Sequence, residues 1–296
     1  MKNSLGISCL LAFTLFITGG TVNVLAVPIL EYEFNGTGTT TANSGSQAGG
    51  TLTFKNAAGA ATNLYSASGL GVSGLAGDMA FDNTASSGMG RDDTGGRAES
   101  SANFANLGTV QSFTIQGWYK ADEIGDGAKL FEMTGGTVIT LATNAADRLS
   151  LSLPNNFSQS AASTIYASSD AWVFFGVTYD GTLTSNNVKY YAGTVGSAVS
   201  LVSTTTLNLG ALPIGFASLA IGNSYNSNSR PFDGLMDDFR FFDSTTGADG
   251  ALGLAQLEEL RMSAIPEPSS AILFLGAGLS ALVLVVRRRK ASVSVV

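Results

Sequence analysis

The chain has 296 residues and a formal net charge of −7, and only 12% of its residues are charged. It contains no histidine, which removes both the commonest general base and the commonest transition-metal ligand. An acidic chain of this kind is also poorly suited to binding nucleic acid or an anionic membrane surface.

The N-terminal residues 1–26 are typical of a secretory signal peptide. One cation, Lys2, precedes an apolar run over residues 10–17, and small residues lead up to a cleavage point after Ala26. The single cysteine, Cys9, lies inside this segment, so the mature chain would have no disulfide. We therefore expect the remainder of the chain to be exported through the cytoplasmic membrane.

The region that follows, residues 27–265, contains 10 Lys and Arg against 21 Asp and Glu, a net charge of about −11. Its length suits one large all-β sandwich or two small domains. We find neither an internal repeat nor a second domain, and therefore predict one domain over residues 27–262. Within it, residues 37–50 are rich in Gly, Ser and Thr and predict a surface loop.

Apolar and polar residues alternate in this region with a period of two, as in half-buried strands. Residues 112–120 place Phe113, Ile115 and Tyr119 on one predicted face, with polar residues on the other. Residues 172–181 show the same pattern and end in Asp-Gly, so with residues 186–194 they predict a hairpin with a longer loop.

Similar short runs recur between turn residues, and one segment alone, residues 251–262, repeats apolar residues at helical spacing. The further strand-like runs are residues 29–36, 50–56, 77–83, 129–136, 136–143, 148–154, 218–223 and 234–243. This pattern predicts an all-β fold, namely a two-sheet antiparallel jelly-roll sandwich.

The C-terminal region has three successive parts. Pro266, Glu267 and Pro268 form a rigid extended peptide, which belongs to a linker over residues 263–268. Residues 269–286 are apolar and uncharged, and are long enough for a transmembrane helix at the short end of the usual range. The basic tail, residues 287–296, begins with Arg287, Arg288, Arg289 and Lys290, which would stay in the cytoplasm.

The strand-like segments and the two ends of the chain resemble those of two known protein families. Residues 112–120, 172–181, 188–194 and 219–243 resemble, in order, the strands of LamG-like, concanavalin A-type jelly-roll domains, and the resemblance covers about residues 27–261. Both ends of the chain look like those of a PEP-CTERM protein. That resemblance implies an exosortase as processing partner, with cleavage near Pro266–Pro268 and release or attachment at the cell surface. A permanently anchored ectodomain is the alternative.

No catalytic set is visible in the sequence. The laminarinase-type hydrolases of the resembled fold have a Glu-x-Asp-x-x-Glu pattern, which this chain lacks. Its acidic clusters are Asp92-Asp93, the loop-like residues 122–126 and Asp237-Asp238. Because adjacent residues on a strand point to opposite faces, Asp237 and Asp238 cannot act together on one glycosidic bond. Nucleophile motifs and phosphate-cradling loops are also absent. We therefore expect a protein that is not an enzyme.

Aromatic and amide side chains are the best candidates for binding a ligand. Trp118 and Tyr225 are two possible stacking platforms for a sugar, although Trp118 could instead fill the sandwich. Tyr225 lies in an Asn-rich loop with Asn223, Asn226 and Asn228, and we choose these four residues as the ligand-binding candidates. The alternative for this loop is a simple solvated turn.

A structural calcium ion is a further candidate. In residues 234–243, alternation places Asp237 with Phe239 and Phe241 on the core face, where an unpaired carboxylate is costly. The resemblance implies calcium at this aspartate, which Glu31 or Glu33 could help to bind. Capping of Asp237 by backbone amides or by a neighbouring side chain is the alternative.

Together these features predict an exported, non-catalytic protein of the cell surface or extracellular matrix. Its expected partners are polysaccharide or surface and matrix components, and the membrane through residues 269–286 before processing. A glycan-specific lectin is the first alternative, and a glycan-active hydrolase of the same fold is the second.

Overall fold

The computed structural model describes residues 26–100, 105–145 and 147–266. The expected signal sequence at residues 1–25, Glu267, Pro268, the expected membrane span and the basic tail lie outside these ranges. Within the described ranges, no helix is long and apolar enough to cross a membrane.

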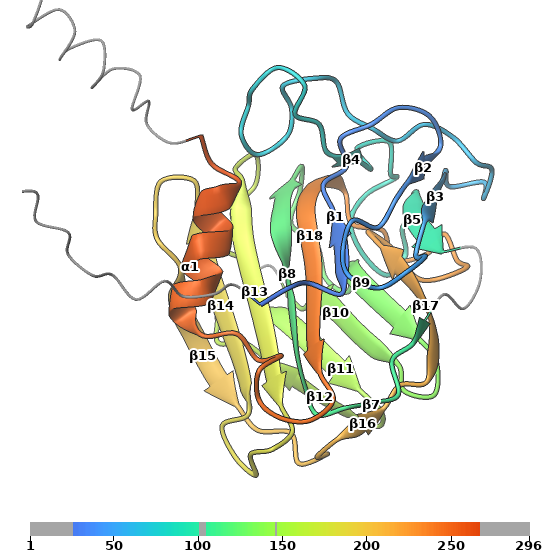
Figure 1. The fold of residues 1–296 in the computed structure, drawn as a ribbon. Helices are drawn as coiled ribbons and strands as arrows, with labels where there is room; N and C mark the ends of the chain where they lie inside the picture. Colours follow the sequence, from blue (N-terminus) through green and yellow to red (C-terminus); the bar gives the residue numbers. More distant parts are fainter. Residues whose placement is uncertain (1–25, 101–104, 146, 267–296) are drawn as a thin grey trace, which may run out of the picture.

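Two sheets pack face to face (Figure 1). The first sheet consists of β1 (Leu30–Tyr32), β4 (Phe81–Asp82), β8 (Ser112–Ala121), β13 (Val173–Asp180), β14 (Val188–Thr194), β15 (Ser200–Thr205) and β18 (Gly234–Ser244). Its order is β1-β18-β8-β13-β14-β15, with β4 beside β18. All of these neighbours are antiparallel.

The second sheet supplies the surface on which the candidate site lies. It consists of β2 (Thr40–Thr41), β3 (Leu52–Lys55), β5 (Arg97–Ser100), β6 (Ala105–Asn106), β9 (Lys129–Thr134), β10 (Ile139–Thr143), β11 (Leu149–Leu153), β12 (Asn156–Gln159) and β17 (Phe216–Ile221). Its order is β12-β11-β10-β9-β17-β5-β3-β2, with β6 beside β17. A separate short pair joins β7 (Thr109–Val110) to β16 (Leu212–Pro213).

The predicted all-β antiparallel sandwich is confirmed. Phe113, Ile115 and Tyr119 lie in the core between the sheets, as their alternation predicted. The predicted hairpin is β13 and β14, which pair from Val173 with Thr194 to Tyr179 with Val188. Alternation works here because one face of each strand meets the other sheet.

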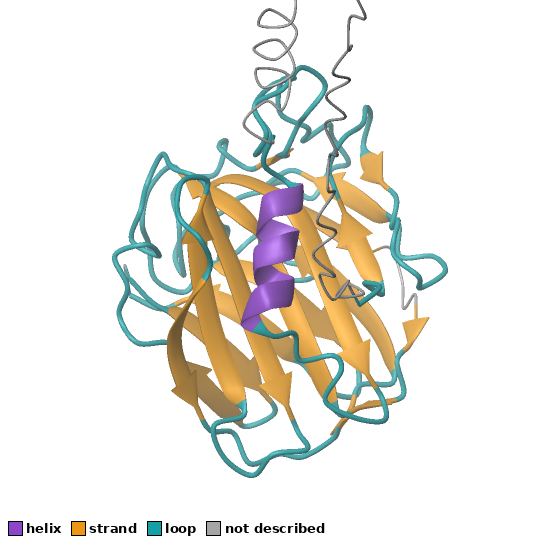
Figure 2. Ribbon diagram, turned by 60° about the vertical axis from the view of Figure 1, so that its left-hand side comes forward, coloured by secondary structure: helices purple, strands orange, loops and turns teal. Residues whose placement is uncertain are grey.

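The outer face of the first sheet is covered by helix α1 (Leu254–Ser263) (Figure 2). Leu257 and Leu260 of α1 join a second apolar cluster with Trp118 and Phe174 of the strands below. Gly176 permits this contact, because a Cβ atom there would lie 3.2 Å from Leu257 side-chain atoms. Trp118 is only 1% exposed, so of its two alternative roles the structure supports packing and not that of an exposed sugar platform.

Helix α1 begins later than the sequence spacing predicted, at Leu254 rather than at residue 251. Gly253 is its N-cap, and the Gly253 amide donates to the Gln256 side chain at 3.0 Å, which starts the helix there. After the helix, Ala264 and Ile265 still pack against the second apolar cluster. The folded region therefore continues up to Pro266.

The Gly- and Ser-rich residues 37–50 form a loop that includes the short strand β2. Asn43 fastens this loop to the first sheet. Its Oδ1 accepts the Glu31 amide at 2.8 Å, and its Nδ2 donates to the Ile29 and Gln47 carbonyls. Although its composition is of low complexity, this loop is therefore held in place by defined hydrogen bonds.

Candidate functional site

The Asp237 carboxylate lies on the outer face of the first sheet rather than in the main core. Asp237 pairs with the outward-facing Trp118, and the register then shifts before Arg240 pairs with Gln116. Asp238 has a φ of 46°, so it takes up the bulge that returns Phe239 to the core face. The predicted shared face of Asp237 and Phe239 is therefore wrong, because uninterrupted alternation had been assumed.

Two backbone amides cap the Asp237 carboxylate. The Val72 amide donates to Oδ2 at 3.0 Å, and the Asp238 amide donates to Oδ1 at 2.8 Å. Burial and the nearby Asp238 nevertheless raise the pKa of Asp237 well above its usual range. Asp237 is 2% exposed, so this capping offsets part of the cost of its burial.

The side chains as placed do not form the predicted calcium site. Glu31 is in an ion pair with Arg240, whose Nε donates to Glu31 Oε1 at 2.6 Å. Glu33 is exposed and lies beyond β1. Among the residues that the structure describes, no three His, Cys, Asp or Glu are grouped to hold a metal. Amide capping is thus the better account of Asp237, and calcium binding stays a prediction to be tested.

The loop that carries the predicted ligand-binding residues follows β17. Asn223 is fully buried, and its amide group donates to the Gly95 and Gly96 carbonyls. Asn223 therefore anchors the loop and does not face solvent. Asn228 is exposed and donates to the Ala57 carbonyl at 3.0 Å, which ties the loop to the turn after β3.

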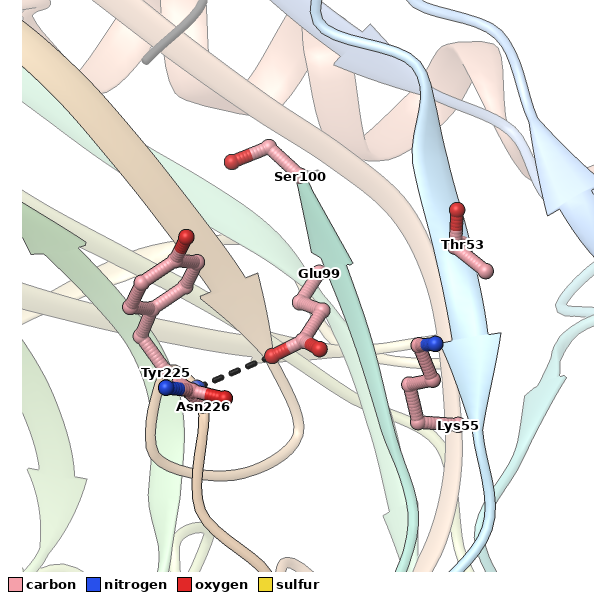
Figure 3. Close-up of a pocket in the computed structure, with 6 residues that line it drawn as sticks. All are labelled: Thr53, Lys55, Glu99, Ser100, Tyr225 and Asn226. Atoms are coloured by element: carbon pink, nitrogen blue, oxygen red, sulfur yellow. Dashed lines mark hydrogen bonds between the residues drawn. The ribbon is translucent and has the colours of Figure 1, made fainter. Parts of the chain in front are cut away.

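Tyr225 and Asn226, by contrast, line a pocket of about 340 Å³. The other lining residues are Thr53 and Lys55 of β3 and Glu99 and Ser100 of β5. Figure 3 shows the Tyr225 ring and the Lys55 side chain on opposite sides of the Glu99 carboxylate. The structure thus brings two of the four predicted residues together with four residues that were not predicted.

The pocket lies on the outward face of the second sheet. Thr53 and Glu99 are register partners on neighbouring strands, and the adjacent partners Phe54 and Ala98 point into the core. Successive strand residues point to opposite faces, so Thr53 and Glu99 point outward. The site is therefore on the side of the sandwich opposite to helix α1.

Two buried glutamates hold the Tyr225 loop against this sheet. Glu132 Oε1 accepts the Tyr225 amide at 2.8 Å, and Glu99 Oε2 accepts the Asn226 amide at 2.9 Å. Both glutamates are register partners of Ala220, from opposite sides, so they flank it. The loop thus rests directly over β17, in a conformation set by two carboxylates.

Each of these carboxylates is also paired with a cation of its own strand. Arg97 donates to Glu99 with Nε at 2.6 Å and Nη2 at 3.1 Å, which is a bidentate contact. Lys129 pairs with Glu132. Glu99 and Glu132 are 8% and 7% exposed, so both pairs are shielded from water. A buried, hydrogen-bonded ion pair fixes geometry, which keeps the loop in place.

The sequence pattern pointed to neither glutamate, because spacing along one strand does not show which strands are neighbours in the sheet. Glu99 and Glu132 lie on strands separated by β17, and only the sheet order places them on either side of Ala220. The one local signal was Arg97 and Glu99, opposite charges two residues apart on a strand face. Two of the loop acidic residues that the sequence did single out join separate loops, since Asp126 accepts the Ala145 amide and Glu123 accepts the Met89 amide.

Comparison with protein families agrees with this architecture. Residues 92–249 match the family model of the concanavalin A-like lectin/glucanases superfamily. The chain belongs to this superfamily. Residues 264–290 match the PEP-CTERM protein-sorting motif, which includes Pro266, Glu267 and Pro268. A search of curated protein sequences found no match to the chain.

Solved structures share the fold at low sequence identity. Domain 4 of an extracellular arabinanase from Geobacillus stearothermophilus, solved with arabinotriose, is 16% identical, with a TM-score of 0.52 over 80% of this chain and 100% of that one. The binding domain of botulinum neurotoxin serotype G is 13% identical, with a TM-score of 0.50 over 80% of this chain and 51% of that one. At these identities the likeness concerns the fold alone.

Proposed function

We propose that the exported region is a non-catalytic glycan-binding module of the cell surface or extracellular matrix. The observation that carries this proposal is the pocket on the second sheet, which combines an aromatic ring, Tyr225, with hydrogen-bonding groups from Asn226, Thr53 and Lys55. Sites for small ligands typically join a few placed polar groups to an aromatic or apolar wall. The buried ion pairs beneath the loop give this pocket a preformed shape.

Two further facts support a glycan as the ligand. The domain of similar fold from Geobacillus stearothermophilus was solved with arabinotriose. The sorting motif at residues 264–290 directs proteins to the cell exterior, where polysaccharides are abundant. We propose that an exosortase cleaves near this motif, so that the module acts after release from, or attachment to, the cell surface. Binding to matrix proteins through the same pocket is the rival to glycan recognition.

A glycan array tests the proposal directly. The full-length chain, kept in detergent because of its expected C-terminal span, should give saturable signals with a small group of related glycans. Absence of any signal at high protein concentration would contradict the proposal and favour a purely structural role.

A hydrolase is the second candidate function, since Glu99 and Glu132 flank Ala220 on the site face. We propose that both carboxylates are structural, because each is paired with a cation and accepts a loop amide. Incubation of the glycans that bind with the protein should therefore release no reducing ends. Product formation that is lost in Glu99→Gln or Glu132→Gln would instead establish a glycanase.

A further inference from the structure

A second pocket, of about 300 Å³, lies on the chain segments next to the first. Its lining includes Asn56, Ala57 and Leu64 from the turn after β3, Asn83 and Ala85 from the loop after β4, and Gly96 at the start of β5. None of its lining residues is charged. The first pocket, by contrast, contains Lys55 and Glu99.

Three connections show that the two pockets are neighbours. Lys55 lines the first pocket, and the next residue, Asn56, lines the second. Gly96 of the second pocket leads directly into β5, which supplies Glu99 to the first. The Tyr225 loop reaches the second pocket through Asn228, which donates to the Ala57 carbonyl at 3.0 Å. The two pockets therefore lie on adjoining segments of β3, β5 and the Tyr225 loop.

The Asn83 side chain in the second pocket is committed to the protein backbone. Asn83 Nδ2 donates to three carbonyls, those of Gly96, Gly222 and Phe232, and Asn83 Oδ1 accepts the Gly96 amide at 2.8 Å. Asn56 Oδ1 accepts the Ala60 amide at 3.0 Å. The groups left to meet a ligand are the methyl groups of Ala57, Leu64 and Ala85, together with the amide nitrogen of Asn56.

We propose that the recognised glycan carries a small apolar substituent, an acetyl, O-methyl or deoxy methyl group, which enters the second pocket while its sugar ring occupies the first. This inference rests on the proposed function. The polar first pocket suits hydroxyl groups, whereas the second offers no free charge and mainly methyl groups. Burial of one methyl-sized group in such a pocket supports discrimination of about tenfold over the unsubstituted sugar.

Paired probes test this proposal with the full-length chain in detergent. Acetylated, methylated and 6-deoxy oligosaccharides are compared with their unsubstituted counterparts by equilibrium binding. The parent should bind at least one substituted probe about tenfold more tightly than its counterpart. Ala85→Phe fills the second pocket from an exposed position and should abolish this preference while leaving affinity for the unsubstituted probe unchanged.

Two further variants complete the design. Ala58→Phe, an exposed position on another wall of the same pocket, should reproduce the loss. Ala248→Phe, the same change at an exposed position in the loop after β18, should keep the parent's preference.

Equal parent affinities for substituted and unsubstituted probes would overturn the inference while leaving glycan binding intact. A preference that survives both Ala85→Phe and Ala58→Phe would also overturn it. If the parent bound none of the probes or array glycans, the proposed function itself would fail, and this inference with it.

Discussion

Asp237 shows how one buried carboxylate is accommodated without a cation at its side. Its two oxygens each accept a backbone amide, from Val72 and from Asp238, and the bulge at Asp238 supplies one of these donors. Charge-assisted bonds of this kind are stronger than neutral ones and compensate part of the desolvation cost. The resulting arrangement links the loop at Val72 to β18.

This capping leads to a prediction about calcium. Because amides already satisfy Asp237 and Glu31 is held by Arg240, thermal unfolding should have the same midpoint with calcium and with chelator. Asp237→Asn should lower stability by about 1–3 kcal/mol under both conditions, since one backbone amide loses its side-chain oxygen acceptor. A midpoint that rises with calcium in the parent but not in Asp237→Asn would instead establish a bound ion.

At the residue scale, the sequence predicted those positions whose role depends on local pattern. The inward positions Phe113, Ile115 and Tyr119 followed from alternation alone. Asp237 did not, because a bulge at one residue with positive φ inverts the face of everything after it. Glu99 and Glu132 did not either, because their relation through Ala220 depends on which strands are neighbours.

Among the described residues, helix α1 is the one helix beside the strands, and it covers part of the outer face of the first sheet. Leu257 and Leu260 pack on Trp118 and Phe174. Arg261 ties the helix end to the hairpin below by donating to the Thr194 and Val195 carbonyls at 2.7 and 3.2 Å. Trp118 and Phe174, on the outer strand face, are therefore as buried as residues of the core.

Two leucines of this helix give a matched test of that packing. Leu257 is fully buried and Leu254 is 46% exposed. Leu257→Ala should destabilise the protein by about 2–5 kcal/mol, because it removes buried methyl groups and leaves a cavity. Leu254→Ala should change stability by less than about 0.5 kcal/mol. Denaturant unfolding measures both, and similar effects of the two changes would show that α1 does not cover the sheet.

Sequence patterns predicted the strands and the helix, but they did not predict which strand faces the helix would cover. The hairpin of β13 and β14 and the existence of a late helix were both expected and are both present. Nothing in the alternation of residues 112–120 indicated that their outward face, with Trp118, would lie beneath that helix. Such coverage results from contacts between segments far apart in the chain, which local periodicity does not encode.

On the scale of the whole molecule, the first residues matched by the sorting motif, from 264 onward, belong to the described and packed part of the chain. Ile265 packs on the apolar cluster beneath α1, and Pro266 follows at once. The start of the motif therefore lies on the side of the sandwich opposite to the pocket around Tyr225. We expect that processing near residues 266–268 would leave this pocket undisturbed.

A substitution in the motif tests this division of roles. Glu267→Ala should leave export unchanged and block maturation, because the recognition element is altered while the domain is not. Immunoblots of membrane and medium fractions should show accumulation of the unprocessed form. Glu259→Ala, on helix α1, should mature as the parent does. Equal release of the Glu267→Ala protein would argue against recognition of this motif.

The most direct test of the central claim is equilibrium binding of the best array glycan to the parent and to two aromatic variants. Tyr225 lines the pocket, whereas Phe157 is 65% exposed on β12, at the far edge of the same sheet. Tyr225→Ala should weaken binding at least about tenfold, since truncating a central aromatic typically costs more than 1 kcal/mol, and Phe157→Ala should bind as the parent does. Undiminished binding by Tyr225→Ala would contradict the assignment of this pocket as the glycan site.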